Sequence, residues 1–176
     1  MTFKETSLAG AFLIEPKIYE DERGFFTDTF LEKTFAEKGL ACRFVQSCVS
    51  FNKQKGTLRG MHYQLPPKAQ PKLVRCARGS VYDVIVDLRP DSPTYRRWFG
   101  AELNEKNRLA LYIPEGMAHG FQTIEDNTEI FYQIAEDYAP ELARGARWDD
   151  PAFGIRWPLA SPILSERDAS YPDFQA

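Results

Sequence analysis

The stretch Thr57-Leu-Arg-Gly-Met-His-Tyr-Gln64 organises this chain, and it holds His62, one of only two histidines. Residues 58–64 alternate in the way that β-strands do. The alternation predicts one shared face for the even-numbered positions, namely Leu58, Gly60, His62 and Gln64. An isolated histidine is also compatible with a hydrogen-bonded place in the core. If the shared face lines a barrel, however, His62 points into a cavity where an imidazole can exchange protons near neutral pH.

Short strand-like runs continue on both sides of this stretch. They are expected at residues 12–14, 25–30, 44–51, 72–77, 81–88, 95–103, 108–113, 121–123 and 128–134. Residues 31–39 are expected to form a short helix that ends at Gly39, and residues 114–120 a loop. Turn signals about every 8–12 residues favour a sandwich or barrel. We therefore predict an all-β fold, a cupin-like double-stranded β-helix (jelly roll) with short peripheral helices and a cavity for a small molecule.

Composition limits the function. A length of 176 residues predicts a single domain over residues 1–176, and 43% apolar residues predict a globular one. A net charge of −3 without a basic run argues against nucleic acid as a partner. No stretch resembles a membrane span or a signal core, so no membrane partner is expected. Three cysteines, an odd number without metal-type pairing, suit reduced thiols and a cytoplasmic location.

The candidate side chains of this sequence suit acid–base chemistry better than metal or nucleophilic chemistry. Two histidines are too few for a dedicated metal site, so no metal is expected. Nothing local would activate Cys48 as a nucleophile. Tyr132 shares its strand face with two isoleucines and is aimed into the barrel, either as a core tyrosine or as a functional one. Lys72 is either a solvated edge charge or, inside a cavity, the stabiliser of an oxyanion. Asp168 could orient His62 only through a tertiary contact.

Seven motifs carry a resemblance to a known family. They are Asp21-Glu-Arg-Gly-Phe-Phe26, Leu58-Arg-Gly-Met-His-Tyr-Gln64, Gln70-Pro-Lys-Leu-Val74, Asp83-Val-Ile-Val-Asp-Leu-Arg89, Ile113-Pro-Glu-Gly-Met-Ala-His-Gly-Phe121, Trp148-Asp-Asp-Pro151 and Leu164-Ser-Glu-Arg-Asp168. In order and spacing they resemble the dTDP-4-dehydrorhamnose 3,5-epimerase family. The resemblance implies a metal-free cupin-like jelly roll without a cofactor, usually a homodimer, that acts on the nucleotide-diphosphate sugar dTDP-4-keto-6-deoxyglucose.

The same resemblance implies a role for individual residues. It makes His62 the general base, Asp168 the carboxylate that orients it, Lys72 the cation beside the enolate oxygen and Tyr132 the acid on the opposite face. It also implies substrate contacts, which are expected at Arg23, Phe26, Asp28, Gln46, Arg59, His119, Tyr138 and Arg167. The segment that holds Arg23, Phe26 and Asp28 is expected to reach the site from the partner subunit.

Several functions stay open at the level of the sequence. Proton abstraction and return at carbons 3 and 5 of a 4-keto-6-deoxyhexose is the main interpretation. Inversion at carbon 3 alone, a ketoisomerase, or an epimerase for a CDP-linked or other nucleotide-linked sugar are alternatives. A sugar-binding barrel without catalysis is a further alternative, but it would have no need of a base and an opposed acid.

Overall fold

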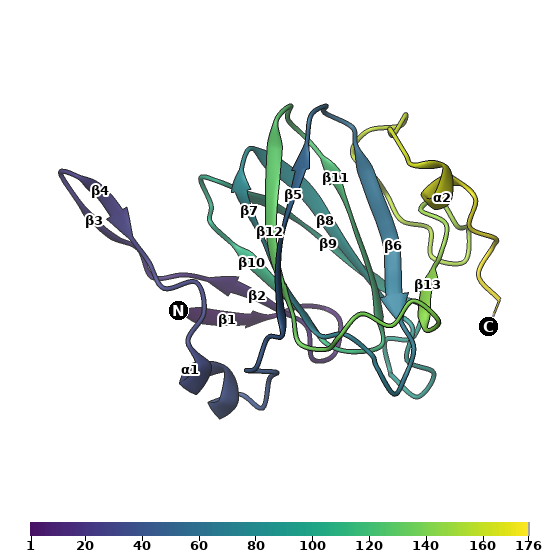
Figure 1. Ribbon diagram of the computed structural model, residues 1–176, viewed down its shortest axis with the longest axis horizontal. Helices are drawn as coiled ribbons and strands as arrows, with labels where there is room; N and C mark the ends of the chain where they lie inside the picture. Colours follow the sequence, from purple (N-terminus) through teal and green to yellow (C-terminus); the bar gives the residue numbers. More distant parts are fainter. Residues whose placement is uncertain (176) are drawn as a thin grey trace.

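Antiparallel sheets form almost the whole protein in the computed structural model, which describes residues 1–175 (Figure 1). The six-stranded sheet contains, in spatial order, β1 (Thr2–Glu5), β2 (Phe12–Glu15), β10 (Ala110–Ile113), β7 (Lys72–Arg78), β12 (Thr128–Ile134) and β5 (Gln46–Asn52). The five-stranded sheet contains β13 (Ala143–Gly145), β6 (Leu58–Gln64), β11 (Met117–Thr123), β8 (Ser80–Asp87) and β9 (Trp98–Asn104). The predicted all-β jelly roll is confirmed.

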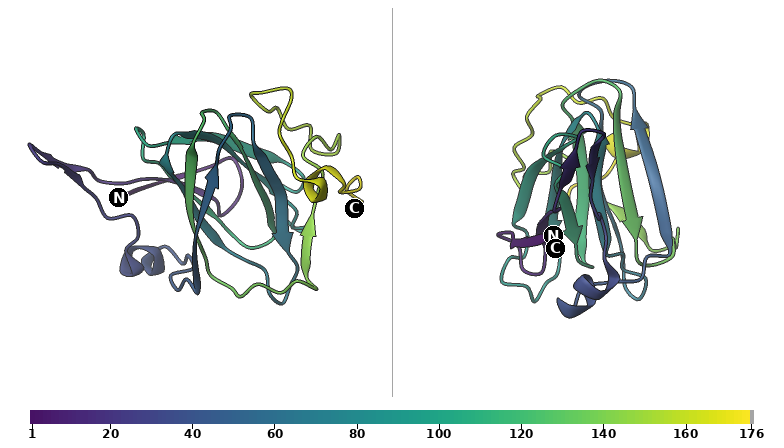
Figure 2. Two further views of the ribbon diagram at one scale, coloured as in Figure 1. Left: turned by 45° about the horizontal axis from the view of Figure 1, so that its top comes forward. Right: turned by 90° about the vertical axis from the view of Figure 1, so that its left-hand side faces the viewer.

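Three short elements lie outside the two sheets. The strands β3 (Tyr19–Asp21) and β4 (Gly24–Phe26) form a hairpin that extends away from the body of the protein (Figures 1 and 2). Helix α1 (Glu32–Glu37) lies below the six-stranded sheet in Figure 1, and α2 (Glu166–Ala169) lies beside β13 and β6. The hairpin and α2 are therefore at opposite ends of the molecule.

Alternation along the strands divides the apolar side chains among three clusters. The central cluster fills the space between the two sheets and includes Val74, Ile85, Leu111, Phe121 and Ile130. A second cluster lies between the outer face of the five-stranded sheet and the C-terminal segment, and a third packs α1 against the six-stranded sheet. The central cluster does not occupy all of the space between the sheets, and the remainder is available for a site.

Several secondary-structure predictions needed correction. The strand expected over residues 25–30 ends at Phe26, since Phe30 instead packs 4.9 Å from Phe35 and 5.1 Å from Phe44, between ring centroids. The loop expected over residues 114–120 becomes strand β11 from Met117, where β6 and β8 pair with it on both sides. Strands β1 and β13 and helix α2 were not predicted, because each is short and is held mainly by tertiary pairing.

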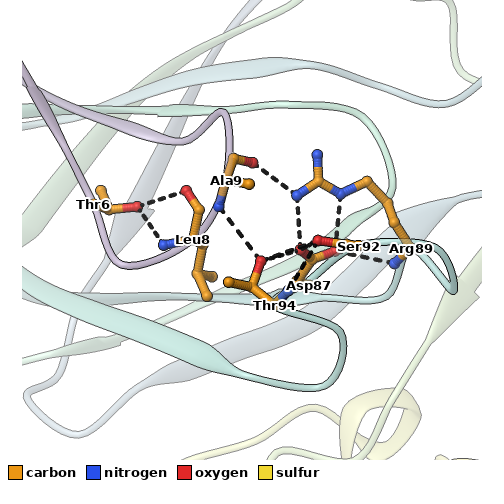
Figure 3. A network of polar contacts seen from close by, with 7 residues as sticks. All are labelled: Thr6, Leu8, Ala9, Asp87, Arg89, Ser92 and Thr94. Atoms are coloured by element: carbon orange, nitrogen blue, oxygen red, sulfur yellow. Dashed lines mark hydrogen bonds and ion pairs between the residues drawn. The ribbon is translucent and has the colours of Figure 1, made fainter.

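One buried carboxylate holds the turn after β8 together (Figure 3). Asp87 is fully buried and accepts hydrogen bonds from Arg89 Nε at 2.8 Å, Ser92 Oγ at 2.5 Å and Thr94 Oγ1 at 2.6 Å. Arg89 Nη2 also donates to the backbone oxygen of Ala9 at 2.7 Å, which joins the N-terminal loop to this turn. Burial opposes ionisation, but the hydrogen bonds outweigh it and hold the pKa of Asp87 well below its ordinary range.

The Asp87→Asn variant is therefore expected to lose roughly 2–4 kcal/mol of unfolding free energy at pH 7, because a charged acceptor for several donors is removed. A lowered pKa stabilises the fold above the ordinary carboxyl pKa of about 4, and this contribution is lost as the pH falls below it. Urea denaturation at pH 7 and at pH 3 measures both effects. Asp91→Asn, an exposed carboxylate in the same turn, is the matched control and should change little.

Candidate active site

The histidine strand β6 is irregular at its centre. It pairs with β11 through His62 opposite His119 and Arg59 opposite Phe121, so the register shifts between these two pairs. Gly60 lies at the shift with a φ of +136°, and a Cβ there would be 2.5 Å from the Cα of Gly120. Only glycine fits this close approach.

The shift changes which side chains of β6 share a face. Arg59 and His62, three positions apart, line the same cavity, whereas Leu58 and Gly60 do not line it. The predicted common face of Leu58, Gly60, His62 and Gln64 was therefore wrong in part. Strict alternation fails here because a bulge advances the strand by one residue, which reverses the direction of every side chain beyond it.

The cavity lies between the sheets and has a volume of about 240 Å³. Its walls come from five different strands, and the lining residues are Ser50, Arg59, His62, Lys72, His119, Phe121 and Tyr132. An adjoining hollow of about 130 Å³ shares His62 and Lys72 with this cavity and also includes Tyr138, Arg144 and Arg167. We call the first space the inner lobe and the second the outer lobe.

His62 and Asp168 form a close pair although 106 residues separate them. His62 Nε2 lies 2.7 Å from Asp168 Oδ1, and the Gly60 amide donates to the other carboxylate oxygen at 3.4 Å. Asp168 is only 4% exposed. Burial opposes its ionisation, but the bond with His62 prevails and the pKa of Asp168 is lowered. A buried carboxylate on one ring nitrogen fixes the imidazole's orientation and stabilises its protonated form.

Tyr132 faces this pair from the other sheet. Its strand β12 belongs to the six-stranded sheet and β6 to the five-stranded one, yet Tyr132 and His62 line the same lobe. The Tyr132 ring packs against the central cluster, as its alternation with Ile130 predicted. Burial, and then the neighbouring Cys48 thiol, raise the pKa of Tyr132, while the charge of Arg59 lowers it. The phenol is therefore protonated at neutral pH, as a proton donor must be.

Two further lining residues of the inner lobe, His119 and Arg59, are each held by a polar side chain behind the wall. His119 Nε2 lies 3.0 and 3.1 Å from the two carboxylate oxygens of Asp83, which is fully buried. Arg59 Nε donates to Asn52 Oδ1 at 2.8 Å, which holds the guanidinium at the wall. Asp83 and Asn52 were not predicted. An acidic residue within the apolar run of residues 81–88 was a signal for the first of them.

Lys72 stands where the two lobes meet. Burial lowers its pKa to about 8, and the negative charge of Asp83 partly offsets this effect. At neutral pH the ammonium group is therefore mostly charged. A cation in a cavity shielded from water can stabilise negative charge that develops on a substrate oxygen.

The catalytic rate is expected to fall as the pH rises through about 8, because Lys72 then loses its proton and with it the positive charge. Lys72→Met should lower kcat on the order of 10²-fold, the usual effect of one lost oxyanion partner, and should abolish this limb of the profile. Steady-state rates between pH 6 and 9.5 test both statements. Lys68, which pairs with Glu136 at 2.7 Å outside the inner lobe, provides the control variant Lys68→Met.

Of the remaining predicted site residues, some line a lobe of the cavity and others do not. Tyr138 and Arg167 line the outer lobe. Gln46 is exposed at the start of β5 and lines neither lobe. Arg23 and Phe26 lie on the β3–β4 hairpin and Asp28 just after it, and none of the three lines either lobe. The hairpin extends away from the two sheets (Figures 1 and 2). Arg23 pairs with Asp21 of the same hairpin at 2.5 Å. One chain therefore does not bring these three residues to the cavity.

Within residues 1–175, histidine, cysteine and acidic side chains form no group of three or more that could hold a metal ion. No helix in this described part of the chain is long and apolar enough to cross a membrane.

Comparisons with known proteins identify similar chains. The family model for dTDP-4-dehydrorhamnose 3,5-epimerase matches residues 5–176. The epimerase of that name from Sinorhizobium fredii is 46% identical over 173 residues, which cover 98% of this chain and 89% of the relative. The Bacillus anthracis epimerase, solved with TDP and PPi bound, superposes with a TM-score of 0.95 at 42% identity over 98% of this chain and 99% of that one.

A third similar protein was solved with a sugar nucleotide. The Legionella pneumophila epimerase, in complex with dTDP-4-keto-L-rhamnose, has a TM-score of 0.90 and 39% identity, and the match covers 99% of both chains. The match of the family model over nearly the full length, together with relatives well above 30% identity, identifies the family. The chain belongs to the dTDP-4-dehydrorhamnose 3,5-epimerase family.

Proposed function

We propose that the protein converts dTDP-4-dehydro-6-deoxy-D-glucose to dTDP-4-dehydro-L-rhamnose by inverting carbons 3 and 5. The observation that carries this proposal is the placement of His62 and Tyr132 on facing sheets of one cavity, with Lys72 on the wall between its lobes. Inversion requires a base on one face of the sugar ring and a proton donor on the other. A pair of side chains on facing walls meets that requirement.

The proposed reaction has two proton transfers at each carbon. Because Nε2 of His62 is held by Asp168, the other ring nitrogen, Nδ1, removes the hydrogen next to the 4-keto group, and the C–H electrons move to form the enolate. Lys72 stabilises the negative oxygen, and the Asp168 carboxylate stabilises the imidazolium. Tyr132 then gives its phenolic proton to the opposite face of the carbon. Solvent restores the proton of Tyr132 and removes that of His62, so no redox cofactor or metal is needed.

The outer lobe suits the diphosphate of the substrate. It contains the guanidinium groups of Arg144 and Arg167 and the ring of Tyr138, and it opens directly from the lobe that holds His62. Arginine forms strong, directional bonds with phosphate oxygens. We propose that the sugar ring enters the inner lobe while the diphosphate stays in the outer one. Gln46, Arg59 and His119 are proposed as further substrate contacts.

Deuterium incorporation tests the function and its alternatives together. The protein is incubated in deuterated water with the dTDP-linked and the CDP-linked 4-keto-6-deoxyglucose. Uptake at carbons 3 and 5 of the dTDP sugar, with inverted product, is the expected result. Uptake at carbon 3 alone would identify a 3-epimerase, and preference for the CDP sugar would reassign the nucleotide. Binding without any uptake would contradict catalysis and indicate a sugar-binding barrel.

We also propose a homodimer, because the hairpin and the edge strand β5 expose large apolar side chains. Phe26 is 65% exposed and Phe25 49%, and on the outer side of β5 Val49 is 60% exposed. Large apolar side chains gathered on a strand edge and a projecting hairpin are typical of surfaces that another copy covers. In such a dimer the hairpin would carry Arg23, Phe26 and Asp28 toward the nucleotide of the partner.

Sedimentation velocity at micromolar concentration is therefore expected to show a dimer. Phe26→Asp together with Val49→Asp should shift the distribution toward monomer, since charges would be buried at the contact. The exposed pair Lys33→Ala and Glu37→Ala on α1 serves as the control. A fully active monomer for the unmodified chain would contradict both the dimer and the role of the hairpin in the partner's site.

We also propose a single catalytic domain and a cytoplasmic location. The central cluster joins strands from the first half of the chain to strands from the second, which supports one catalytic domain over residues 1–176. All three cysteines are free thiols, which supports a reducing compartment and hence a cytoplasmic location.

A further inference from the structure

The segment that follows α2 returns to the active site through one aromatic residue, Tyr171. The ring lies so close to Gly145 of β13 that a Cβ on this glycine would be 2.0 Å from the ring carbon Cζ. Gly145 is the register partner of His62 in β6, and directly paired residues of antiparallel strands share a face. The Tyr171 ring thus occupies the side-chain position next to His62 on the face of the sheet that lines the site.

Tyr171 also contacts His62 and Arg167, which lie on either side of Asp168 in the site. Its ring meets that of His62 edge to face, with 6.1 Å between centroids and 70° between planes. Its hydroxyl accepts a hydrogen bond from Arg167 Nε at 2.9 Å. Arg167 directly precedes Asp168 in the chain and lines the outer lobe. One side chain therefore connects the proposed base, the turn that carries its carboxylate and a wall of the substrate site.

Helix α2 is attached to the sheet before its first residue, where the Leu58 amide donates to the Ile163 oxygen at 2.9 Å, and Tyr171 supplies a contact after its last residue. The helix has four residues, and a single helical turn has little stability of its own. The Ser165 cap accepts from the Asp168 amide at 3.1 Å, which shapes the turn but does not attach it to the sheet. Beyond Tyr171 the chain is held separately, by an Arg147–Asp173 ion pair at 2.6 Å and by the Phe174 ring 5.1 Å from that of Phe153.

We infer that Tyr171 is a positioning residue: its ring, seated over Gly145, holds α2 against β6 and β13 so that the Asp168 carboxylate stays on His62. Its hydroxyl separately holds the guanidinium of Arg167 at the outer lobe. The inference rests on the proposed roles of His62 and Asp168. The ring is expected to affect kcat, because it supports the base. The hydroxyl is expected to affect KM, because it supports a substrate contact.

A double-mutant cycle tests the role of the ring. Tyr171→Ala is expected to lower kcat for solvent deuterium exchange on the order of 10-fold or more, since small misplacements of catalytic groups are costly. In an Asp168→Asn background the same change should have little further effect, because the carboxylate that the ring positions is already gone. Gly145→Ala should resemble Tyr171→Ala, since the added methyl group displaces the ring. Tyr171→Phe should keep kcat and raise KM several-fold.

Phe174→Ala is the matched control, since it removes an aromatic ring from the same terminal segment but away from His62. It should leave kcat within about 2-fold of the unmodified protein, the range of additive distant changes. Equal losses from Tyr171→Ala with and without Asp168 would overturn the inference, as would an unchanged kcat in Tyr171→Ala. If His62→Asn exchanges at the normal rate, the proposed base itself is wrong. A deuterium-exchange rate that falls in His62→Asn but not in Tyr171→Ala would refute the positioning role of Tyr171 and leave the proposed function intact.

Discussion

Replacement of His62 by Asn is expected to lower the rate of deuterium exchange at carbons 3 and 5 by a factor on the order of 10² to 10⁴, the usual contribution of a positioned acid–base group. The amide has no basic nitrogen, so it cannot accept the substrate proton. The shorter Asn side chain also ends before the position of Nε2, which lies 2.7 Å from Asp168 Oδ1 in the native protein. Exchange measured by NMR in deuterated water gives the rate directly.

The fold should survive this substitution, because His62 belongs to none of the three apolar clusters. Circular dichroism and thermal unfolding of the variant are needed beside the rate. Phe121→Leu, a conservative change elsewhere in the wall of the same lobe, controls for disturbance of the cavity. A folded His62→Asn variant that exchanges deuterium as fast as the native protein would remove His62 from the mechanism.

The Tyr132→Phe variant is expected to separate exchange from inversion. The substitution keeps the ring and its packing against the central cluster and removes only the hydroxyl. His62 would still take the proton and return it, or a deuteron, to the same face of the sugar. Deuterium uptake should therefore continue, while net inversion falls by a factor on the order of 10² or more because its donor is missing.

A structural role for the Tyr132 hydroxyl predicts a different outcome. Loss of one buried hydrogen bond would then lower the unfolding free energy by roughly 1 kcal/mol and leave inversion intact. Uptake and product stereochemistry are followed in one NMR experiment, and stability is measured by urea denaturation. Tyr112→Phe is the control, since this tyrosine is buried on the other side of the sheet and bonds the Ala41 amide at 2.9 Å. Normal inversion in Tyr132→Phe would exclude the donor role.

Local patterns were sufficient for the strands that carry His62 and Tyr132. The bounds of β6 and β12 coincide with the alternating runs at residues 58–64 and 128–134. The inward direction of Tyr132 followed from its alternation with Ile130. The helix stop was predicted from the glycine at position 39, and its positive φ of 68° agrees with that role. Alternation and turn residues depend on the backbone of a few neighbouring positions, which is why one sequence is enough to read them.

The arrangement of side chains around His62 did not follow from local sequence patterns. The bulge at Gly60, which brings Arg59 to the same lobe, depends on how closely β11 approaches β6. Asp168 reaches His62 from a four-residue helix near the other end of the chain, and the composition of α2 alone gives no reason for that contact. Composition, alternation and motifs determined the all-β class and the choice of the proposed acid–base residues, because those are local properties. Only the tertiary structure decided register, the faces beyond the bulge and the partners of each ionisable group, because these depend on packing between distant segments.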